Sequence, residues 1–223
     1  MIRLGRVKKH LITFSTALFM LFAGRLPSFA KDFYWENPVA ITHGDARFPS
    51  VQNTESGGLV FWQNVDTAKK EIYISCRSYR ALGDFHDSEN FAGPFTYSGD
   101  EVPYIYTSAT LKSGLTAVAV LSASNQISVY TSSDSGYSWK SCHIKTSGLM
   151  VAPRIFTGGG EKKDRFKMFI SAGEENSFML YESVSSDGLS WSGFEQFKPA
   201  SKLRNPFLPY LSTIEGSDAV VFQ

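Results

Sequence analysis

The sequence predicts an all-β fold in which four-stranded units repeat along the chain. Beyond residue 30, short alternating or apolar runs rich in Val, Ile, Phe, Tyr and Thr are separated by Gly, Ser, Asn and Asp, which is typical of strands joined by tight turns. No window of a dozen residues shows a helical period. Similar units recur about every fifty residues. Four strands repeated at this spacing indicate a β-propeller, whose blades pack around a central channel.

The apolar runs define the strands of each predicted blade. The first blade, about 48–98, has strands at 48–53, 59–65, 71–78 and 95–98, and the second, about 104–146, has strands at 104–111, 115–122, 126–132 and 140–146. The third, about 151–197, has strands at 151–156, 165–171, 177–184 and 194–197, and a partial fourth, 205–223, has strands at 205–212 and 218–223. Residues 33–42 resemble the last strand of a blade, so the propeller region spans 31–223.

The chain ends inside a repeat. The sequence Phe61-Trp62-Gln63 in the first unit and Val221-Phe222-Gln223 at the end occupy the same place in the unit. One outer strand, three blades and half of a fourth fall short of a ring of roughly 4 to 8 blades. We therefore expect an incomplete propeller of about three and a half blades, which is either the N-terminal part of a longer one or the product of a truncated reading frame. Its unpaired end blades would expose strand edges that invite pairing with another chain.

Two related turns mark the second and third units. Ser132-Ser133-Asp134-Ser135-Gly136-Tyr137-Ser138-Trp139 has a shortened copy, Ser185-Ser186-Asp187-Gly188-Leu189-Ser190-Trp191, and their Trp residues are 52 positions apart. Asp and Ser side chains bond nearby backbone N–H groups, Gly takes positive φ, and Trp can fold back as an apolar plug. We therefore assign these residues a structural role in hairpin turns.

These turns resemble the bacterial neuraminidase repeat, or Asp-box, of sialidase-like β-propellers, whose pattern is Ser-x-Asp-x-Gly-x-x-Trp. Ser132 to Trp139 matches it in full, and Ser185 to Trp191 lacks one residue between Asp and Gly. The equivalent loop of the first unit, 80–94, has lost the motif, and Phe85 or Phe91 is the candidate replacement for the Trp. The resemblance covers 33–223 and implies a propeller. It implies little about activity, because binding proteins and several enzyme classes carry the motif.

The first thirty residues have the pattern of a secretory signal peptide. A basic start is followed by an apolar run at 11–22, and Ser28-Phe29-Ala30 provides small residues for cleavage before Lys31. An uncleaved anchor is the alternative, but the run is shorter than the roughly 20 apolar residues that span a bilayer. We therefore expect a secreted or periplasmic protein without a transmembrane segment after cleavage.

Composition limits the partners of the mature chain. Cleavage after Ala30 removes five of 22 basic residues and none of 21 acidic ones, which leaves a net charge of about −4. A slightly acidic protein is a poor partner for nucleic acid. Cys76 and Cys142 are the only cysteines, and either a disulfide or two buried thiols fits their positions in corresponding strand regions.

The strongest candidate for a ligand site is Arg47-Phe48-Pro49, on the face opposite the Asp-bearing turns. The resemblance to sialidases implies a role for it, because an Arg-Ile-Pro sequence opens their first blade and its Arg binds the substrate carboxylate. A guanidinium suits that planar anion. Asp66, in the same blade, is then a weak candidate for the catalytic acid/base. The family's other arginines and its Tyr–Glu pair come from later blades, and Phe48 stands where the family has Ile.

Other candidates are weaker. Arg154 and Arg204 also fall on the predicted ligand face and are weak ligand-binding candidates. Asp84, His86 and Asp87 fit a solvated loop better than a metal site, since no second ligand cluster accompanies them. We therefore predict neither a metal nor a cofactor.

These observations favour an exported Asp-box propeller that acts as a noncatalytic scaffold for a ligand, with a glycan as the first guess from the family resemblance alone. The alternative is a sialidase-like glycoside hydrolase whose later blades are absent from this chain. A degenerate remnant without function is the third interpretation.

Overall fold

The computed structural model describes residues 44–54, 57–79, 85–146, 148–150, 153–158, 164–174, 177–198, 210–214 and 217–221. All of them belong to the compact unit Ile41–Gln223, whereas the second unit, Met1–Ala40, contains the predicted signal peptide and lies outside the described residues. Every regular element in the described ranges is a β-strand. In this part of the chain no helix is long and apolar enough to cross a membrane.

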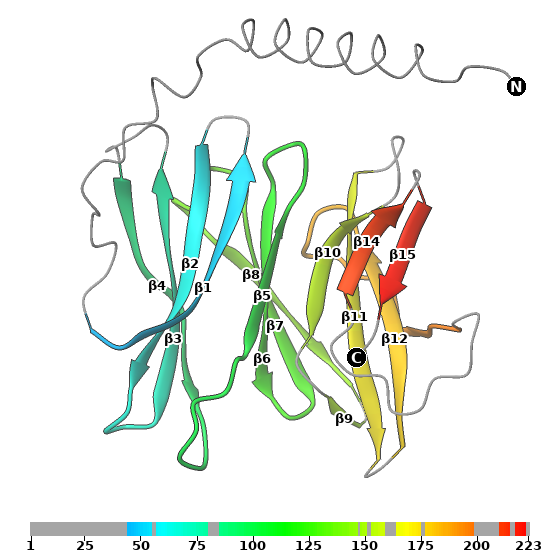
Figure 1. Cartoon of the computed structure of the whole chain (residues 1–223), viewed down its shortest axis with the longest axis horizontal. Helices are drawn as coiled ribbons and strands as arrows, with labels where there is room; N and C mark the ends of the chain where they lie inside the picture. Colours follow the sequence, from blue (N-terminus) through cyan, green and yellow to red (C-terminus); the bar gives the residue numbers. More distant parts are fainter. Residues whose placement is uncertain are drawn as a thin grey trace, which may run out of the picture. The chain divides into compact units, whose positions relative to one another are not determined.

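The strands form three antiparallel sheets with four strands in sequence order, and a separate two-stranded sheet (Figure 1). The first sheet contains β1 (Ala46–Thr54), β2 (Gly57–Asp66), β3 (Glu71–Tyr79) and β4 (Phe85–Thr96), and the second contains β5 (Tyr106–Thr110), β6 (Thr116–Ala123), β7 (Gln126–Ser132) and β8 (Lys140–Lys145). The third contains β10 (Arg154–Gly158), β11 (Arg165–Glu174), β12 (Ser177–Ser185) and β13 (Glu195–Gln196), and β9 (Leu149–Met150) also pairs with β11. The last sheet is β14 (Tyr210–Ile214) with β15 (Ser217–Val221). The predicted all-β fold of four-stranded units is confirmed.

The main difference from the predicted strands lies in the first sheet. The sequence predicts a loop over 80–94, but β4 begins at Phe85 and pairs with β3 along its length. Two irregularities in register, one between Ile72 and Ile74 and one between Ile74 and Cys76, accommodate the extra length of β4 relative to β3. An alternating pattern is lost wherever a bulge intervenes, which is why this strand was missed.

The sheets pack face to face through two apolar clusters. Phe61 and Ile74 of the first sheet pack with Val118 of the second in one cluster, and Ala119 of the second sheet packs with Phe166 of the third in the other. Side chains alternate sides along a strand, so β6 serves both clusters: its even-numbered valines, Val118 and Val120, face one way and its alanines, Ala117 and Ala119, the other. All four are fully buried. Each interface is therefore an apolar core of the kind that holds propeller blades together.

The two cysteines lie in different interfaces. Cys76 is buried in the cluster between the first two sheets, whereas Cys142 packs against the cluster between the second and third. No disulfide joins them. Of the two alternatives left open by the sequence, the structure shows two thiols.

The turn from β7 to β8 is built by Ser132 and Asp134. The hydroxyl of Ser132 donates to Asp134 Oδ1 at 2.7 Å and accepts from the Gly136 N–H at 2.8 Å. Asp134 Oδ1 in turn accepts from the Ser138 N–H at 3.0 Å. Burial opposes ionisation of Asp134, but the hydrogen bonds from Ser138 and Ser132 outweigh it and lower the pKa of the carboxyl.

The turn from β12 to β13 repeats this scheme with one residue fewer. Ser185 Oγ accepts from the Gly188 N–H at 2.8 Å, and Asp187 Oδ1 accepts from the N–H groups of Ser190 and Leu189 at 2.7 and 2.9 Å. In both turns the indole N–H folds back on the glycine carbonyl, from Trp139 to Gly136 and from Trp191 to Gly188. The deletion between Asp and Gly therefore leaves the capping pattern intact.

Each of these turns packs against the preceding sheet. A Cβ added to Gly136 would lie 3.1 Å from both Cys76 Sγ and Leu59 Cδ2 of the first sheet. The Trp139 ring stacks on Phe91 of β4, with centroids 4.0 Å apart. Phe91 therefore does not replace a turn Trp in the first unit: it faces the following sheet, whereas a turn Trp faces the preceding one. Phe85 lies on β4 and its side chain is outside the described residues.

Gly188 offers a sharp test of this packing. It has φ +70°, and an added Cβ would lie 2.3 Å from Thr131 Cγ2 in the second sheet. A left-handed backbone costs roughly 1–2 kcal/mol and overpacking roughly 1–3 kcal/mol, so we expect Gly188→Ala to lower the free energy of unfolding by about 2–5 kcal/mol. Urea denaturation of the wild type and the variant measures this loss of unfolding free energy. Gly114→Ala is the matched control, because Gly114 also has a positive φ, +86°, but nothing lies within 4 Å of its Cβ position; equal losses in both variants would contradict the packing.

Asp187 predicts a pH dependence of stability. The Ser190 and Leu189 N–H groups lower its pKa from 3.8 to about 2, against the opposing effect of burial. The unfolded state therefore takes up this proton first as the pH falls, so the stabilisation is complete above about pH 4 and is lost towards pH 2. We expect the difference in unfolding free energy between the wild type and Asp187→Asn to shrink over that interval. A difference independent of pH from 5 to 2 would refute it.

Candidate functional site

The first strands of the three large sheets lie next to one another, with β1 beside β5 and β5 beside β10 (Figure 1). Ser50 and Ser108 hydroxyls lie 3.3 Å apart, and Gln52 Nε2 donates to the Ser108 carbonyl at 3.1 Å. Tyr106, two residues before Ser108, hydrogen-bonds to Phe48 and Ser50, which lie two residues before the Ser50 and Gln52 partners of Ser108. The residue numbers rise together on both strands, so β1 and β5 run in the same direction. Residues that open these strands consequently gather at one end, away from the Asp-bearing turns.

A bulge in β1 brings Phe48 to the surface of this end. The register with β2 shifts between Arg47 and Ser50, and Phe48 adopts φ +54° with 39% of its area exposed. A left-handed conformation is strained for a bulky residue. It is held by the Tyr106 hydroxyl, which donates to the Phe48 carbonyl at 2.6 Å. Burial raises the pKa of this phenol, so it stays a donor at any ordinary pH.

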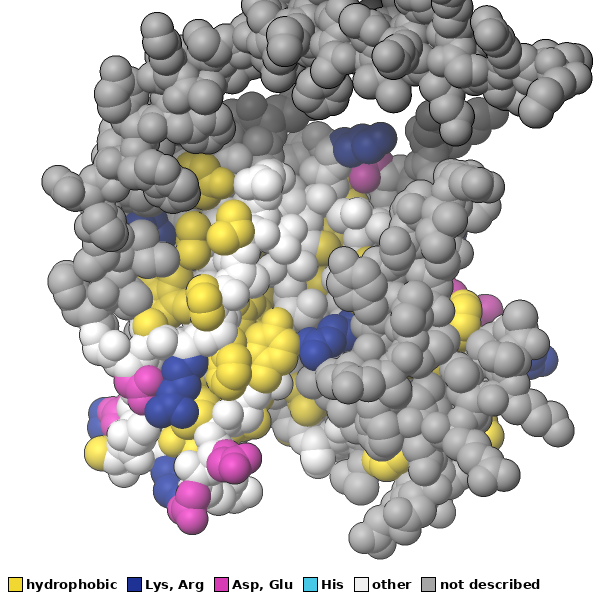
Figure 2. All heavy atoms as spheres, in the orientation of Figure 1, with side chains coloured by type: hydrophobic (Ala, Val, Ile, Leu, Met, Phe, Trp, Pro, Cys, Tyr) yellow, Lys and Arg dark blue, Asp and Glu magenta, His cyan; other side chains and the backbone are white. Residues whose placement is uncertain are grey.

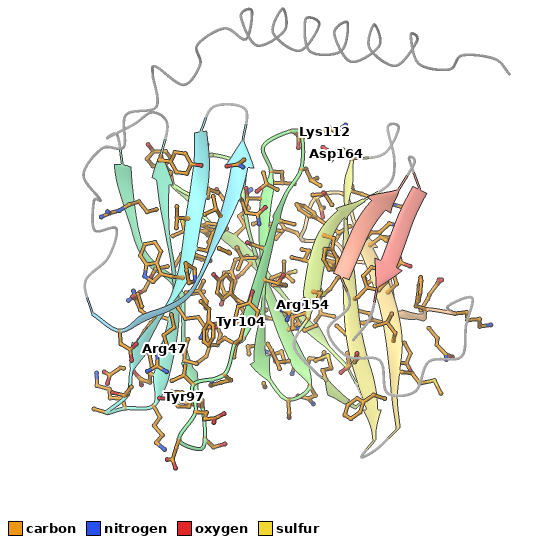
Figure 3. All side chains as sticks on the ribbon, viewed as in Figure 1. Arg47, Tyr97, Tyr104, Lys112, Arg154 and Asp164 are labelled. Carbon is orange, nitrogen blue, oxygen red and sulfur yellow. The ribbon has the colours of Figure 1, made fainter. Side chains whose placement is uncertain are left out.

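Tyr104 lies at the centre of the candidate site. Its ring lies 5.3 Å from that of Phe48 and 5.4 Å from that of Tyr106, and the Arg154 guanidinium carbon lies 5.1 Å from its centroid. Figure 3 shows Tyr104 between Arg47 and Arg154. Burial raises the pKa of Tyr104, and Arg154 partly opposes that shift. In Figure 2 hydrophobic side chains on this face lie between two groups of Lys and Arg side chains. The arrangement is an aromatic surface flanked by cations, suited to a ligand with apolar and polar sides.

Arg47 lies at this end, as the sequence predicts, but an acidic neighbour holds it. Both Asp45 carboxylate oxygens accept from its guanidinium at 2.8 Å, and these hydrogen bonds lower the pKa of Asp45. About 40% of the Arg47 side chain remains exposed. A bidentate pair of this kind fixes the orientation of the guanidinium and satisfies part of its donor capacity.

Asp66 is the last residue of β2 and caps the turn to β3. Asp66 Oδ1 accepts from the Lys69 N–H at 3.1 Å, and Oδ2 lies 3.2 Å from Lys69 Nζ. These contacts, the backbone hydrogen bond first, lower the pKa of Asp66. A general acid needs a raised pKa near the working pH, so the geometry gives Asp66 the environment of a turn cap. Its catalytic role stays a prediction.

The remaining candidates divide by position. Arg154 opens β10 and joins Tyr104, whereas Arg204 and Asp84 lie outside the described residues. The backbones of His86 and Asp87 pair with β3 in β4, not in a loop. Within the described ranges no group of three or more His, Cys, Asp or Glu could hold a metal ion. The sequence reasoning missed Tyr104, although its place just before β5 matches that of Arg154 at the start of β10.

No family model matches the sequence, and no curated protein is significantly similar to it. Among solved structures, the chain is similar to an α-L-arabinanase of Penicillium chrysogenum complexed with arabinobiose, with 14% identity, a TM-score of 0.56, and coverage of 79% of this chain and 57% of that chain. It is also similar to an α-L-arabinofuranosidase from Fusarium graminearum in complex with an iminosugar inhibitor, with 14% identity, a TM-score of 0.50, and coverage of 74% and 52%. The chain thus spans little more than half the length of either.

Similarity at this level of identity establishes the fold and leaves the activity open. The sheets are those of a β-propeller with four-stranded blades. The Asp-box family suggested by the two turns has no matching family model. The first strands β1, β5 and β10 are the inner strands of their blades, and the cluster of Phe48, Tyr104 and Arg154 lies where they begin.

Strain at Phe48 can be measured by comparing two truncations. Phe48→Gly and Phe48→Ala both remove the ring, so the lost packing cancels between them. Because only glycine adopts φ near +54° without strain, we expect the Gly variant to be the more stable by about 1 kcal/mol in urea denaturation. In an ordinary strand alanine is the more stable residue; that order would show that Phe48 is unstrained.

Proposed function

We propose that the protein is an exported β-propeller that recognises a glycan without cleaving it. The observation that carries the proposal is the aromatic pair of exposed Phe48 and half-buried Tyr104 beside the Arg154 guanidinium. A sugar ring has an apolar face that packs on aromatic rings and hydroxyl groups that accept from Arg. Among the described residues no ion pair joins Arg154 to a carboxylate.

The engagement of the nearby acidic groups supports recognition over hydrolysis. Glycosidases generally use two carboxyl groups, one of them a proton donor with a raised pKa. At this end Asp45 is bound by Arg47 and Asp66 by Lys69, and the pKa of each carboxyl is lowered. Both carboxyl groups are therefore ionised and already accept hydrogen bonds, which suits a structural role better than proton donation.

The structural neighbours support the choice of ligand class. Arabinobiose is bound in one of them and an iminosugar inhibitor in the other, so the fold in those proteins presents a sugar-binding surface. The predicted signal peptide at residues 1–30 supports a place outside the cytoplasm, where extracellular and surface glycans are accessible. The binding test that follows is designed to identify the sugar.

The binding test uses the purified protein on a glycan array that includes arabinobiose, fucosides and sialosides, followed by calorimetry. We expect saturable binding that Tyr104→Ala and Arg154→Gln each weaken by about tenfold or more, the loss of about 1.4 kcal/mol that a central contact supplies. Lys112→Ala is the matched control, because Lys112 lies at the opposite end of the strands (Figure 3). Binding that survives Tyr104→Ala, or is lost with Lys112→Ala, would move the site elsewhere.

The alternative function is sialidase-like hydrolysis, in which Arg47 binds the carboxylate and Asp66 acts as acid/base. We expect no fluorophore release from 4-methylumbelliferyl sialoside, because the Asp45 and Lys69 contacts occupy both groups. Release that disappears in Arg47→Ala and in Asp66→Ala, with the fold preserved by circular dichroism, would replace the scaffold by the hydrolase.

A further inference from the structure

We infer that Gln63 is a positioning residue that fixes the Tyr104 ring by clamping the backbone on both sides of it. The inference rests on the proposed function, because it explains how the recognition surface is held ready for a sugar. Gln63 lies on β2 opposite Arg47 of β1 and has no exposed area. Its side chain forms no hydrogen bond with the described residues Phe48 and Arg154, so its effect on sugar binding passes through Tyr104.

Two hydrogen bonds form the clamp. Gln63 Nε2 donates to the Pro103 carbonyl at 2.9 Å, and the Ile105 N–H donates to Gln63 Oε1 at 2.9 Å. Tyr104 is the residue between these two groups. The Ile105 carbonyl also accepts from the Leu121 N–H at 2.9 Å, which ties the segment to β6. A connection that is irregular from residue 97 to 105 is thus held firmly at the one residue that carries the central ring.

A buried glutamine is specific for this task. The amide provides a donor and an acceptor on one planar group, which matches a carbonyl and an N–H on either side of one residue. An apolar side chain would leave the buried Ile105 N–H without a partner and release the Pro103 carbonyl, and an ionised glutamate would offer acceptors only. The desolvation of a buried amide is offset only when both of its bonds form, so the position of the Tyr104 backbone is closely defined.

The second ring of the surface is held in an equivalent way. The hydroxyl of Tyr106, which is fully buried on β5, donates to the Phe48 carbonyl and so fixes the backbone of Phe48. The backbone that carries each ring is therefore fixed by hydrogen bonds from a buried side chain on a neighbouring strand. A surface ordered before binding loses little conformational entropy when a sugar arrives, which is the benefit that the clamp provides.

Gln63→Glu tests the clamp through pH. A protonated glutamic acid restores both bonds, with O–H donating to Pro103 and C=O accepting from Ile105, whereas the anion cannot donate. Burial raises the pKa of such a carboxyl above the usual value of about 4.3, so the switch falls in an accessible range. We expect the variant to bind arabinobiose, or the array glycan that binds most tightly, like the wild type at about pH 5 and about tenfold more weakly at about pH 8.

Gln52→Glu is the matched control. Gln52 also donates to the backbone of β5, but at Ser108, two residues beyond Tyr106. Gln52 is half-buried, so Gln52→Glu reports the general effect of a negative charge beside the inner strands, whereas loss of sugar affinity at high pH belongs to Gln63→Glu alone. Equal pH dependence in the two variants, or none in Gln63→Glu, would overturn the inference. If the glutamate variant does not fold, Gln63→Met, which is of similar size and forms neither bond, must bind weakly at every pH.

A ligand-free measurement separates this inference from the proposed function. With ¹³C-labelled tyrosine, the Tyr104 ring signal, assigned with Tyr104→Phe, is expected to broaden or shift in Gln63→Glu at about pH 8 and to return at about pH 5. Failure of sugar binding with this signal intact would refute the glycan proposal and keep the clamp. A Tyr104 signal insensitive to Gln63 would refute the clamp, whatever the protein binds.

Discussion

The structure depends on a second sheet that is apolar on both faces. Four consecutive residues of β6, Ala117 to Val120, have no exposed area, because each face of the second sheet covers a neighbour. The choice of residues follows from this constraint: valines fill the space towards the first sheet, and alanines leave room for Phe166 and Met168 of the third. Matched volumes of this kind give close packing without cavities. The inner strands, and with them the rings of Phe48 and Tyr104, have fixed neighbours as a consequence.

Much of the fold could be predicted because its signals are local. A turn such as Ser132 to Trp139 contains its own hydrogen-bond partners, so the residue types alone indicate its shape. The long strand β4 could not be predicted, since its register depends on irregularities in pairing with β3. The contact of Phe91 with Trp139 likewise joins residues far apart in the sequence, and no local pattern records it.

The candidate site was predicted only in outline. The sequence placed Arg47 and Arg154 at one end, because residues that open equivalent strands of a repeat meet there. It could not show that Asp45 accepts hydrogen bonds from the Arg47 guanidinium or that Asp66 caps a turn, since both contacts depend on side-chain orientation. The role of Gln63 was also hidden: a glutamine in a strand resembles a solvated residue until the connection from β4 to β5 is seen to cover it.

The turns have one further consequence. The turn of the second sheet fits the first at Cys76 and Leu59, and the turn of the third fits the second at Thr131 and Ala117. Each turn therefore contacts the sheet that precedes it in the chain. The second sheet both packs its own turn against the first sheet and receives the turn of the third. A gene segment that encodes such a sheet carries both halves of the contact, so a tandem copy has a place to pack once its valine face is matched to the alanine face of its parent. The propeller can in this way gain blades one at a time.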